Sequence, residues 1–128
     1  MTERAALQLA VLVFAWVPIV GGAFGVISGA SPAGGPEAAV AFDSHVRYLS
    51  GLLLAIGLGF LTTIPRIEAQ GGRFRLLTLL VLTGGLARLG GAVATGALPG
   101  AVILTRGMEL VVTPLLCLWQ ARIARRRR

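Results

Sequence analysis

The chain has 128 residues, of which 55% are hydrophobic and only 13% are charged. Because soluble domains carry about 25% charged residues, this composition excludes a soluble protein. The length leaves no room for a soluble catalytic domain, a nucleotide-binding fold or a second module beside the apolar segments. We therefore expect one integral membrane domain, residues 1–128, in which any chemistry is done by side chains within or beside the bilayer.

The net charge of +7 arises from twelve basic residues, all of them Arg, and five acidic ones. A nucleic-acid-binding protein spreads its basic residues over a soluble surface, with aromatic side chains on which bases stack. Here a basic tail, residues 122–128, directly follows an apolar segment. Arginines beside a membrane span attract anionic lipid by about 1 kcal/mol per charge. We therefore expect membrane lipids as partners and no nucleic acid.

Apolar runs between Gly-rich and Pro-rich breakers predict four membrane spans, because a spanning helix needs about 20 mostly apolar residues. The first run, residues 5–28, follows Arg4 and ends near small residues, as a secretory signal peptide does. Signal cores are only about 7–15 residues long, so we expect this longer run to remain as a helix. The predicted spans are about 5–28, 43–65, 74–96 and 101–121.

Small residues recur at intervals of four in the first two spans, a spacing typical of helices that pack closely in lipid. These residues are Gly21, Gly25 and Gly29 in the first span, and Gly51, Ala55 and Gly59 in the second. The stripes predict a compact bundle, and any of them could equally form a dimer surface.

The second span opens with a polar segment. Asp43 and Arg47 are four residues apart, the spacing at which side chains meet on a helix, and predict a local salt bridge. Asp43 or Ser44 is also expected to act as the N-cap of this helix. Tyr48 is expected at the outer membrane interface, where Tyr is enriched. The chain has a single His, so we expect no metal site.

The third and fourth spans flank a short turn at Pro99 and are expected to form an antiparallel hairpin. Arg88 lies about ten residues before this turn and Glu109 about ten after it, so at about 1.5 Å per residue they reach the same depth. Ionisable residues inside a span are costly, by about 2.5–3.5 kcal/mol at its centre, and need a partner. We therefore predict that Arg88 and Glu109 form an ion pair.

The role of this pair stays open between a structural lock and the lining of a small polar cavity. The outer half has more guanidinium groups than carboxylates: Arg47, Arg88 and Arg106 against Asp43 and Glu109. Arg106 can extend to the headgroups. A guanidinium without a carboxylate also attracts an anionic lipid or a small acid. The candidate ligand-binding residues are Asp43, Ser44, Arg47, Tyr48, Arg88, Arg106 and Glu109.

Arginine placement predicts the orientation, because cytoplasmic flanks are enriched in basic residues. The connection between the first two spans has no Arg, whereas the amino terminus, residues 66–73 and the tail do. We expect an all-α, up-down-up-down four-helix bundle with both termini cytoplasmic, spanning a bacterial inner membrane several times.

The polar and small residues of three spans together are similar to a known family. They are Asp43, Ser44, Arg47, Tyr48 and Gly51, then Gly84, Gly85, Leu86, Arg88 and Leu89, and finally Glu109, Leu110, Pro114 and Leu115. The chain resembles, over nearly its whole length, the small bacterial four-helix membrane proteins of the domain of unknown function family numbered 4345. The resemblance implies a four-helix membrane bundle and places Arg47, Arg88 and Glu109 on the family's polar positions. It implies no established activity.

Three classes of function remain. The favoured hypothesis is a non-catalytic membrane protein without a cofactor, whose polar cluster is structural or binds an anionic lipid or small acid. It is expected to act as a homo-oligomer or within a larger membrane complex. A small proton-coupled transporter is the second hypothesis, although its only deep carboxylate, Glu109, faces Arg88. A minimal membrane enzyme acting on lipid or quinone, with Glu109 as acid or base, is the third, and no motif for a nucleophile or metal supports it.

Overall fold

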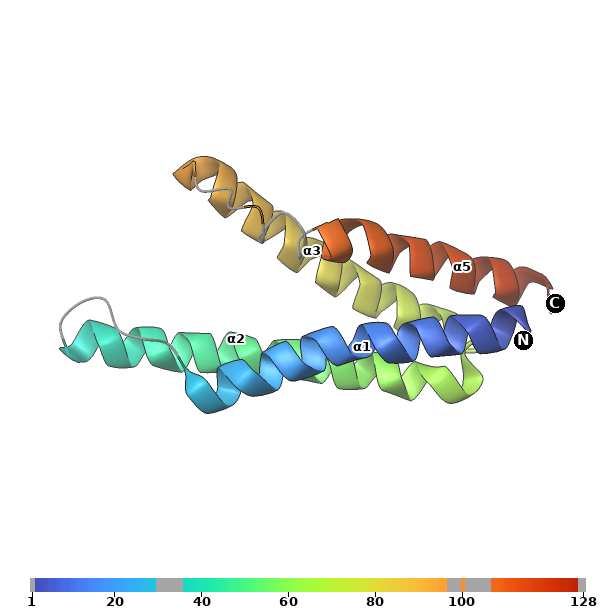
Figure 1. Ribbon diagram of the computed structural model, residues 1–128, viewed down its shortest axis with the longest axis horizontal. Coiled ribbons are helices and arrows are strands. Elements are labelled where there is room, and N and C mark those ends of the chain that lie inside the picture. The colour runs from blue at the N-terminus through green and yellow to red at the C-terminus, as the bar shows by residue number, and fades with distance from the viewer. Residues whose placement is uncertain (1, 30–35, 97–99, 101–106, 127–128) are drawn as a thin grey trace. The chain divides into compact units, whose positions relative to one another are not determined.

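The computed structural model describes residues 2–29, 36–96, 100 and 107–126 (Figure 1). These residues form helices and short connections without any strand, which confirms the predicted all-α fold. In chain order the elements are α1 (Glu3–Ser28), α2 (Pro36–Thr63), the 3₁₀ turn η1 (Ile64–Arg66), α3 (Gly71–Thr95), the π-helical turn η2 (Met108–Val112) and α5 (Thr113–Arg126).

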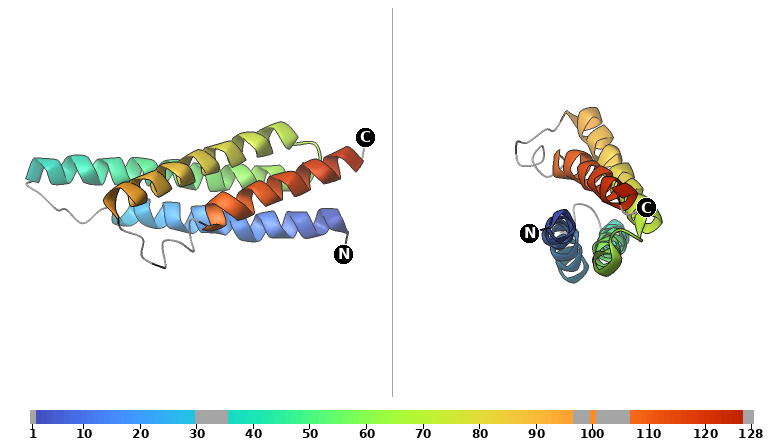
Figure 2. Two further views of the ribbon diagram at one scale, coloured as in Figure 1. Left: turned by 90° about the horizontal axis from the view of Figure 1, so that it is seen from above. Right: turned by 90° about the vertical axis from the view of Figure 1, so that its right-hand side faces the viewer.

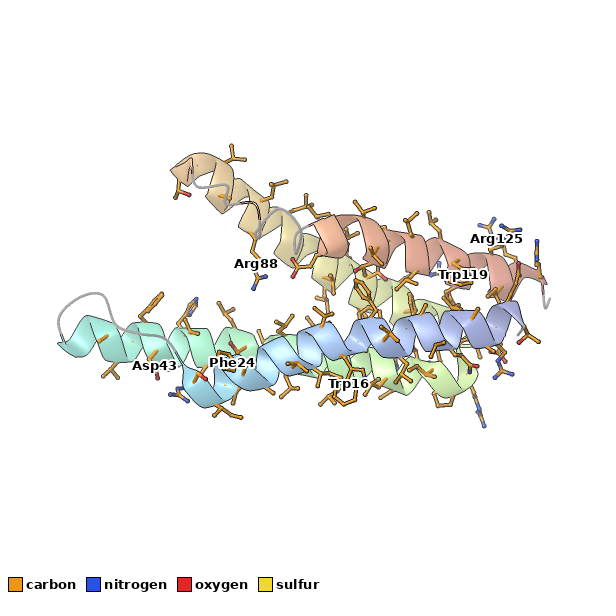
Figure 3. All side chains as sticks on the ribbon, in the orientation of Figure 1. Trp16, Phe24, Asp43, Arg88, Trp119 and Arg125 are labelled. Atoms are coloured by element: carbon orange, nitrogen blue, oxygen red, sulfur yellow. The ribbon has the colours of Figure 1, made fainter. Side chains whose placement is uncertain are left out.

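Three of the described helices are long and apolar enough to cross a membrane: Glu3–Ser28, Ala39–Arg66 and Gly71–Thr95. Large apolar side chains are exposed along them, among them Phe24 (70%) and Ile27 (78%) (Figure 3). Soluble proteins rarely expose such extended apolar surface, whereas lipid accommodates it. The predicted turn at Pro99 and residues 101–106 of the fourth predicted span lie outside the described residues.

The start of α2 differs from the expectation. The helix begins at Pro36, so the expectation that Asp43 or Ser44 is its N-cap is wrong. Proline is favoured in the first helical turn because its missing N–H has no intrahelical partner there. The alanine-rich segment that follows Pro36 favours helix, and it extends α2 ahead of the apolar run.

Backbone conformation explains where three of the helices end. Gly29 and Gly96, which follow α1 and α3, have φ of +65° and +66°, a region that glycine enters without steric cost. The end of α2 precedes Pro65, whose ring disfavours α conformation in the residue before it. The chain there tightens into η1.

The chain divides into two compact units. The first, which we call the α3–α5 unit, comprises Met1–Ala10 and Thr63–Arg128, and the second, the α1–α2 unit, comprises Val11–Thr62. In the α3–α5 unit, α3 and α5 pack against each other and run in opposite directions (Figure 2). The buried residues of α5 are spaced by three and four, which defines one helix face: Thr113, Leu116, Gln120 and Ile123.

The α1–α2 unit is held by glycines that let the two helices approach closely. A Cβ on Gly22 would lie 2.5 Å from the backbone nitrogen of Leu54, and one on Gly57 would lie 2.6 Å from Cγ1 of Ile19. Gly25 faces the side chain of Ser50 in the same way.

The close contacts agree in part with the predicted stripe. Cβ positions on Gly21 and Gly51 would meet other atoms only at 3.9 Å, an ordinary contact distance. Gly25 and Gly29 of the predicted stripe do face close neighbours, and Gly22 takes the place of Gly21. Their spacing of three and then four follows the 3.6-residue turn more closely than intervals of four do.

Candidate functional site

An ion pair joins α3 to η2. Arg88 Nη1 donates to Glu109 Oε1 at 3.2 Å, across 21 residues of sequence, and this contact confirms the predicted pair. The Arg88 side chain is 58% exposed and projects from α3 (Figure 3), whereas that of Glu109 is 24% exposed. The pair therefore lies at the edge of the α3–α5 contact rather than inside it.

The two side chains meet because α3 and η2 approach closely at Gly85, one turn before Arg88. Gly85 is buried, and a Cβ there would lie 3.1 Å from Cδ2 of Leu110 and 3.5 Å from Cβ of Glu109. A side chain at position 85 would require Leu110 to move by a few tenths of an ångström. Gly85 thus allows the close approach of α3 and η2 beside the Arg88–Glu109 pair.

Glu109 lies in the π-helical turn Met108–Val112, directly before Thr113 and Pro114. Inside a regular α-helix, the ring of Pro114 would clash with the carbonyl of Leu110. A wider turn before the proline relieves such a clash, and π turns are frequent at functional sites. Beyond this turn, Thr113 is buried, whereas Val111 within it is exposed.

Thr113 has a buried hydroxyl without a hydrogen-bond partner in the described part of the chain, and only 2% of the residue is exposed. Hydroxyls of the α3 threonines behave differently: Thr78 Oγ1 donates to Phe74 O at 2.9 Å and Thr83 Oγ1 to Leu79 O at 2.8 Å. These are the usual bonds from a threonine to the carbonyl four residues earlier. Leaving a buried hydroxyl unpaired costs about 1–3 kcal/mol. The unpaired hydroxyl of Thr113 directly follows the π turn.

A second ion pair lies in the α1–α2 unit. Arg47 Nε donates to Asp43 Oδ2 at 2.8 Å, as the spacing of four predicts. Arg47 Nη1 donates in addition to the carbonyl oxygens of Val26, at 2.6 Å, and Ile27, at 3.1 Å. These carbonyls belong to the last turn of α1, where no intrahelical N–H reaches them. Arg47 is therefore a cap for the negative end of the α1 dipole.

Gly29 completes this cap. Its N–H donates to the carbonyl of Gly25 at 2.9 Å, and its φ of +65° turns the chain away from the helix axis. A Cβ on Gly29 would collide with Oδ1 of Asp43 and lie 2.7 Å from Nη2 of Arg47. Glycine at this position therefore allows both the backbone turn and the Asp43–Arg47 pair.

The seven predicted ligand-binding residues fall in different parts of the structure. Asp43, Ser44, Arg47 and Tyr48 belong to the α1–α2 unit, where Ser44 and Tyr48 are exposed on α2. Arg88 and Glu109 belong to the α3–α5 unit. Arg106 lies outside the described residues. The structure thus brings Asp43 to Arg47 and, separately, Arg88 to Glu109.

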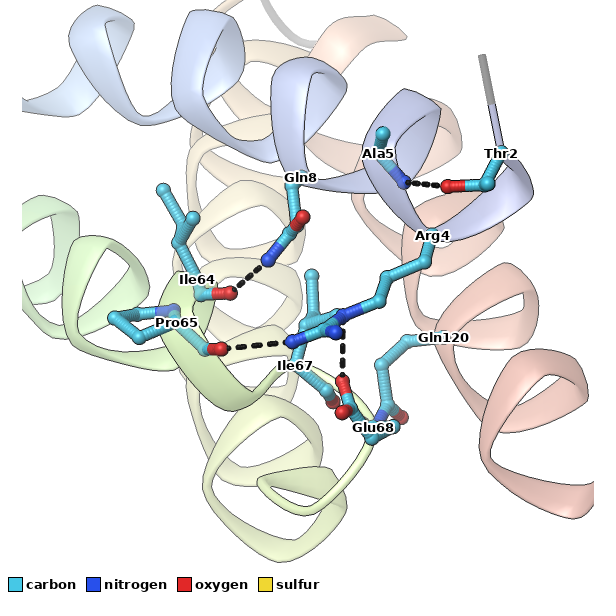
Figure 4. Close-up of polar contacts among 9 residues, drawn as sticks. All are labelled: Thr2, Arg4, Ala5, Gln8, Ile64, Pro65, Ile67, Glu68 and Gln120. Carbon is cyan, nitrogen blue, oxygen red and sulfur yellow. Dashed lines mark hydrogen bonds and ion pairs between the residues drawn. The ribbon is translucent and has the colours of Figure 1, made fainter. Parts of the chain in front are cut away.

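A third polar site was missed by the sequence analysis. Side chains of α1 donate to two carbonyls that follow α2 (Figure 4): Gln8 to Ile64 at 2.7 Å and Arg4 to Pro65 at 3.0 Å. From α5, Gln120 donates to the carbonyl of Ile67, in the same connection, at 2.7 Å. Ile67 is fully buried and Gln120 is 1% exposed. The amides inside apolar runs are the sequence signal for this site, but only ionisable residues were singled out.

Ion pairs surround these hydrogen bonds. Arg4 Nε lies 3.1 Å from Glu68 Oε2, and Arg126 Nη1 lies 2.9 Å from Glu3 Oε2. Both contacts tie the start of α1 to other elements of the α3–α5 unit. The site fixes the α2–α3 connection from two sides.

Taken with its membrane-length helices, this set of polar pairs defines an all-α membrane protein whose charged side chains lie between and beside helices. Over residues 6–120 the sequence matches the model of the family described as Domain of unknown function (DUF4345). The chain belongs to this family, which confirms the resemblance. No curated protein and no solved structure matches the chain. The family description names no activity, so the function has to be argued from the polar sites.

Proposed function

We propose that this protein is a non-catalytic integral membrane protein that binds a carboxylate or phosphate group at Arg88, beside Glu109. The observation that supports the proposal is a difference between two arginines. Arg47 makes three hydrogen bonds through Nε and Nη1. Arg88 makes a single bond within the described residues, through Nη1.

The difference matters because a guanidinium binds an anion best through two parallel hydrogen bonds along one edge. One edge consists of Nε and Nη2, and the other of Nη1 and Nη2. Arg47 has one atom of each edge in use. Arg88 keeps the edge of Nε and Nη2 for a ligand, and its side chain is 58% exposed.

Glu109 contributes by holding Arg88 in one orientation. A guanidinium beside lipid is costly to leave partly unpaired, since few water molecules reach it. A ligand that accepts hydrogen bonds from the Nε and Nη2 edge of Arg88 offsets the cost of leaving that edge unpaired. The ligand would be the headgroup of an anionic lipid or a small carboxylic acid, because both present two oxygens that match the edge.

Native mass spectrometry of the protein released gently from its membrane tests this proposal. The wild type should retain an anionic lipid or acid, and Arg88→Gln should lower its retention by about tenfold or more, because charge-assisted hydrogen bonds contribute about 1.5–3 kcal/mol. Arg47→Gln is the matched control, since it removes the same charge from the α1–α2 unit. The proposal fails if the wild type retains no anion, or if both variants retain it equally.

A further inference from the structure

The described charges are unevenly distributed. Asp43 pairs with Arg47 and Glu109 with Arg88, so these sites add no net charge. The remaining described arginines lie at the start of α1, in η1, at the start of α3 and at the end of α5, together with two carboxylates, Glu3 and Glu68. We call this region the basic end. Its arginines are Arg4, Arg66, Arg73, Arg75, Arg122, Arg125 and Arg126.

Both carboxylates of this region are already engaged in ion pairs. Arg4 forms an ion pair with Glu68, and Arg126 forms one with Glu3. Gly71, at the start of α3, lies beside Gln120 of α5: a Cβ on Gly71 would be 3.5 Å from Gln120 Nε2 and 3.7 Å from Nη2 of Arg75. The basic end is therefore one surface of the α3–α5 unit.

Three exposed arginines of this surface have neither an ion pair nor a side-chain hydrogen bond within the described residues: Arg66, Arg122 and Arg125. Arg75 is exposed as well, but its Nε donates to the carbonyl of Gly71 at 3.2 Å. Arg66 lies on η1, whose neighbouring carbonyls are held by Gln8 and by Arg4. Arg122 follows buried Gln120 and precedes buried Ile123. The backbone under the exposed guanidinium groups is fixed, so binding has to order only their side chains.

The surroundings identify the partner. Leu115 and Leu118 of α5, one to two turns before Arg122, are 57% and 67% exposed, as expected for residues that contact lipid chains. Trp119 lies between these leucines and Arg125 on the same helix (Figure 3), and Trp is enriched at the level of lipid headgroups. The charged surface thus begins where the apolar surface ends.

We infer that the basic end binds the phosphate groups of anionic phospholipids in the leaflet that it faces, through Arg66, Arg122 and Arg125. Each arginine near an anionic surface adds about fivefold to the affinity, and salt screens the attraction. This site is separate from the one proposed at Arg88, because its residues lie on η1 and at the end of α5, whereas Arg88 lies on α3.

The full chain, reconstituted in phosphatidylcholine vesicles, tests the inference with trace spin-labelled phosphatidylglycerol. The measured quantity is the association constant of that lipid relative to spin-labelled phosphatidylcholine. The triple variant Arg66→Gln, Arg122→Gln, Arg125→Gln should lower this ratio severalfold. Salt at 0.5 M should lower the wild-type ratio likewise, because it shortens the Debye length from about 30 Å at 0.01 M ionic strength to about 4 Å. The triple Lys variant should keep the ratio, because it keeps the charge.

Three outcomes would overturn the inference: an unchanged ratio in the triple Gln variant, a ratio insensitive to salt, or binding of soluble polyphosphate to the detergent-solubilised protein as strong as that of phosphatidylglycerol. A ratio lowered only by Arg88→Gln would also overturn it, while supporting the function proposed at Arg88. The two proposals are likewise separated if Arg88→Gln loses its retained anion while the triple Gln variant leaves the lipid ratio unchanged. That result would support the function proposed at Arg88 and overturn the inference about the basic end.

Discussion

Arg47 and Arg88 show how contacts beyond the local helix decide the role of a side chain. Both have a carboxylate partner, Asp43 and Glu109 respectively. Only Arg47 also reaches helix-end carbonyls, those of Val26 and Ile27. These extra bonds turn Arg47 into a structural cap and leave Arg88 as the better candidate for binding an anion.

At the residue scale, Gly29→Ala is expected to destabilise the protein. The substitution places a Cβ against Asp43 and Arg47, at a φ of +65° that costs a non-glycine residue about 1–2 kcal/mol before any clash. The thermal midpoint in detergent should fall clearly. Gly72→Ala is the control, because a Cβ there meets nothing within 4 Å and alanine favours helix. Equal midpoints for the two variants would contradict this account of the cap.

The sequence predicted the pairs that depend on simple geometry. The Asp43–Arg47 pair follows from helix spacing, and Arg88–Glu109 from equal distances to a turn. It could not predict the bonds from Arg47 to α1, because they depend on where α1 ends relative to α2. The alternative role of Arg47 as a ligand-binding residue stays a prediction, with fewer guanidinium donors to support it.

At the element scale, hydropathy predicts that long helices exist, but not how they are interrupted or joined. The π turn before Pro114 departs from the 3.6-residue period of the regular helix predicted for the fourth span. Pro114 was the visible signal for that interruption. The contact at Gly22 in place of Gly21 has a similar origin, since two adjacent glycines were available and packing with α2 selected one.

Gln120 is predicted to be the most important of the side chains that fix the α2–α3 connection. Gln120→Leu leaves the Ile67 carbonyl, in a fully buried residue, without its 2.7 Å hydrogen bond. An unsatisfied buried acceptor costs about 1–3 kcal/mol. Reversible unfolding in mixed detergent micelles should show a loss of this size for Gln120→Leu and a smaller one for Gln8→Leu, whose bond is only partly buried. A larger loss for Gln8→Leu would show that burial does not set the order.

At the scale of the whole molecule, the positions of the charges agree with the arginine pattern of the sequence. The described arginines other than Arg47 and Arg88 gather at the basic end, which includes the start of α1 and the end of α5. The contact of Glu3 with Arg126, at 2.9 Å, brings residues near both ends of the described chain to the same end of the α3–α5 unit. The side of the membrane that the basic end faces is therefore also the side on which residues near both termini lie.

The topology prediction is that this basic end faces the cytoplasm, because basic flanks are retained on that side of the membrane. Cys117 would be replaced by Ala, and a single Cys placed either at Gly72, which is exposed with open space around it, or at Ala33 in the first connection. In intact cells, a membrane-impermeant thiol reagent should label Cys at position 33 and leave position 72 unlabelled until the cells are opened. The reverse pattern would place the basic end, and with it both termini, outside the cytoplasm. It would also remove the anionic cytoplasmic leaflet as the partner of Arg66, Arg122 and Arg125.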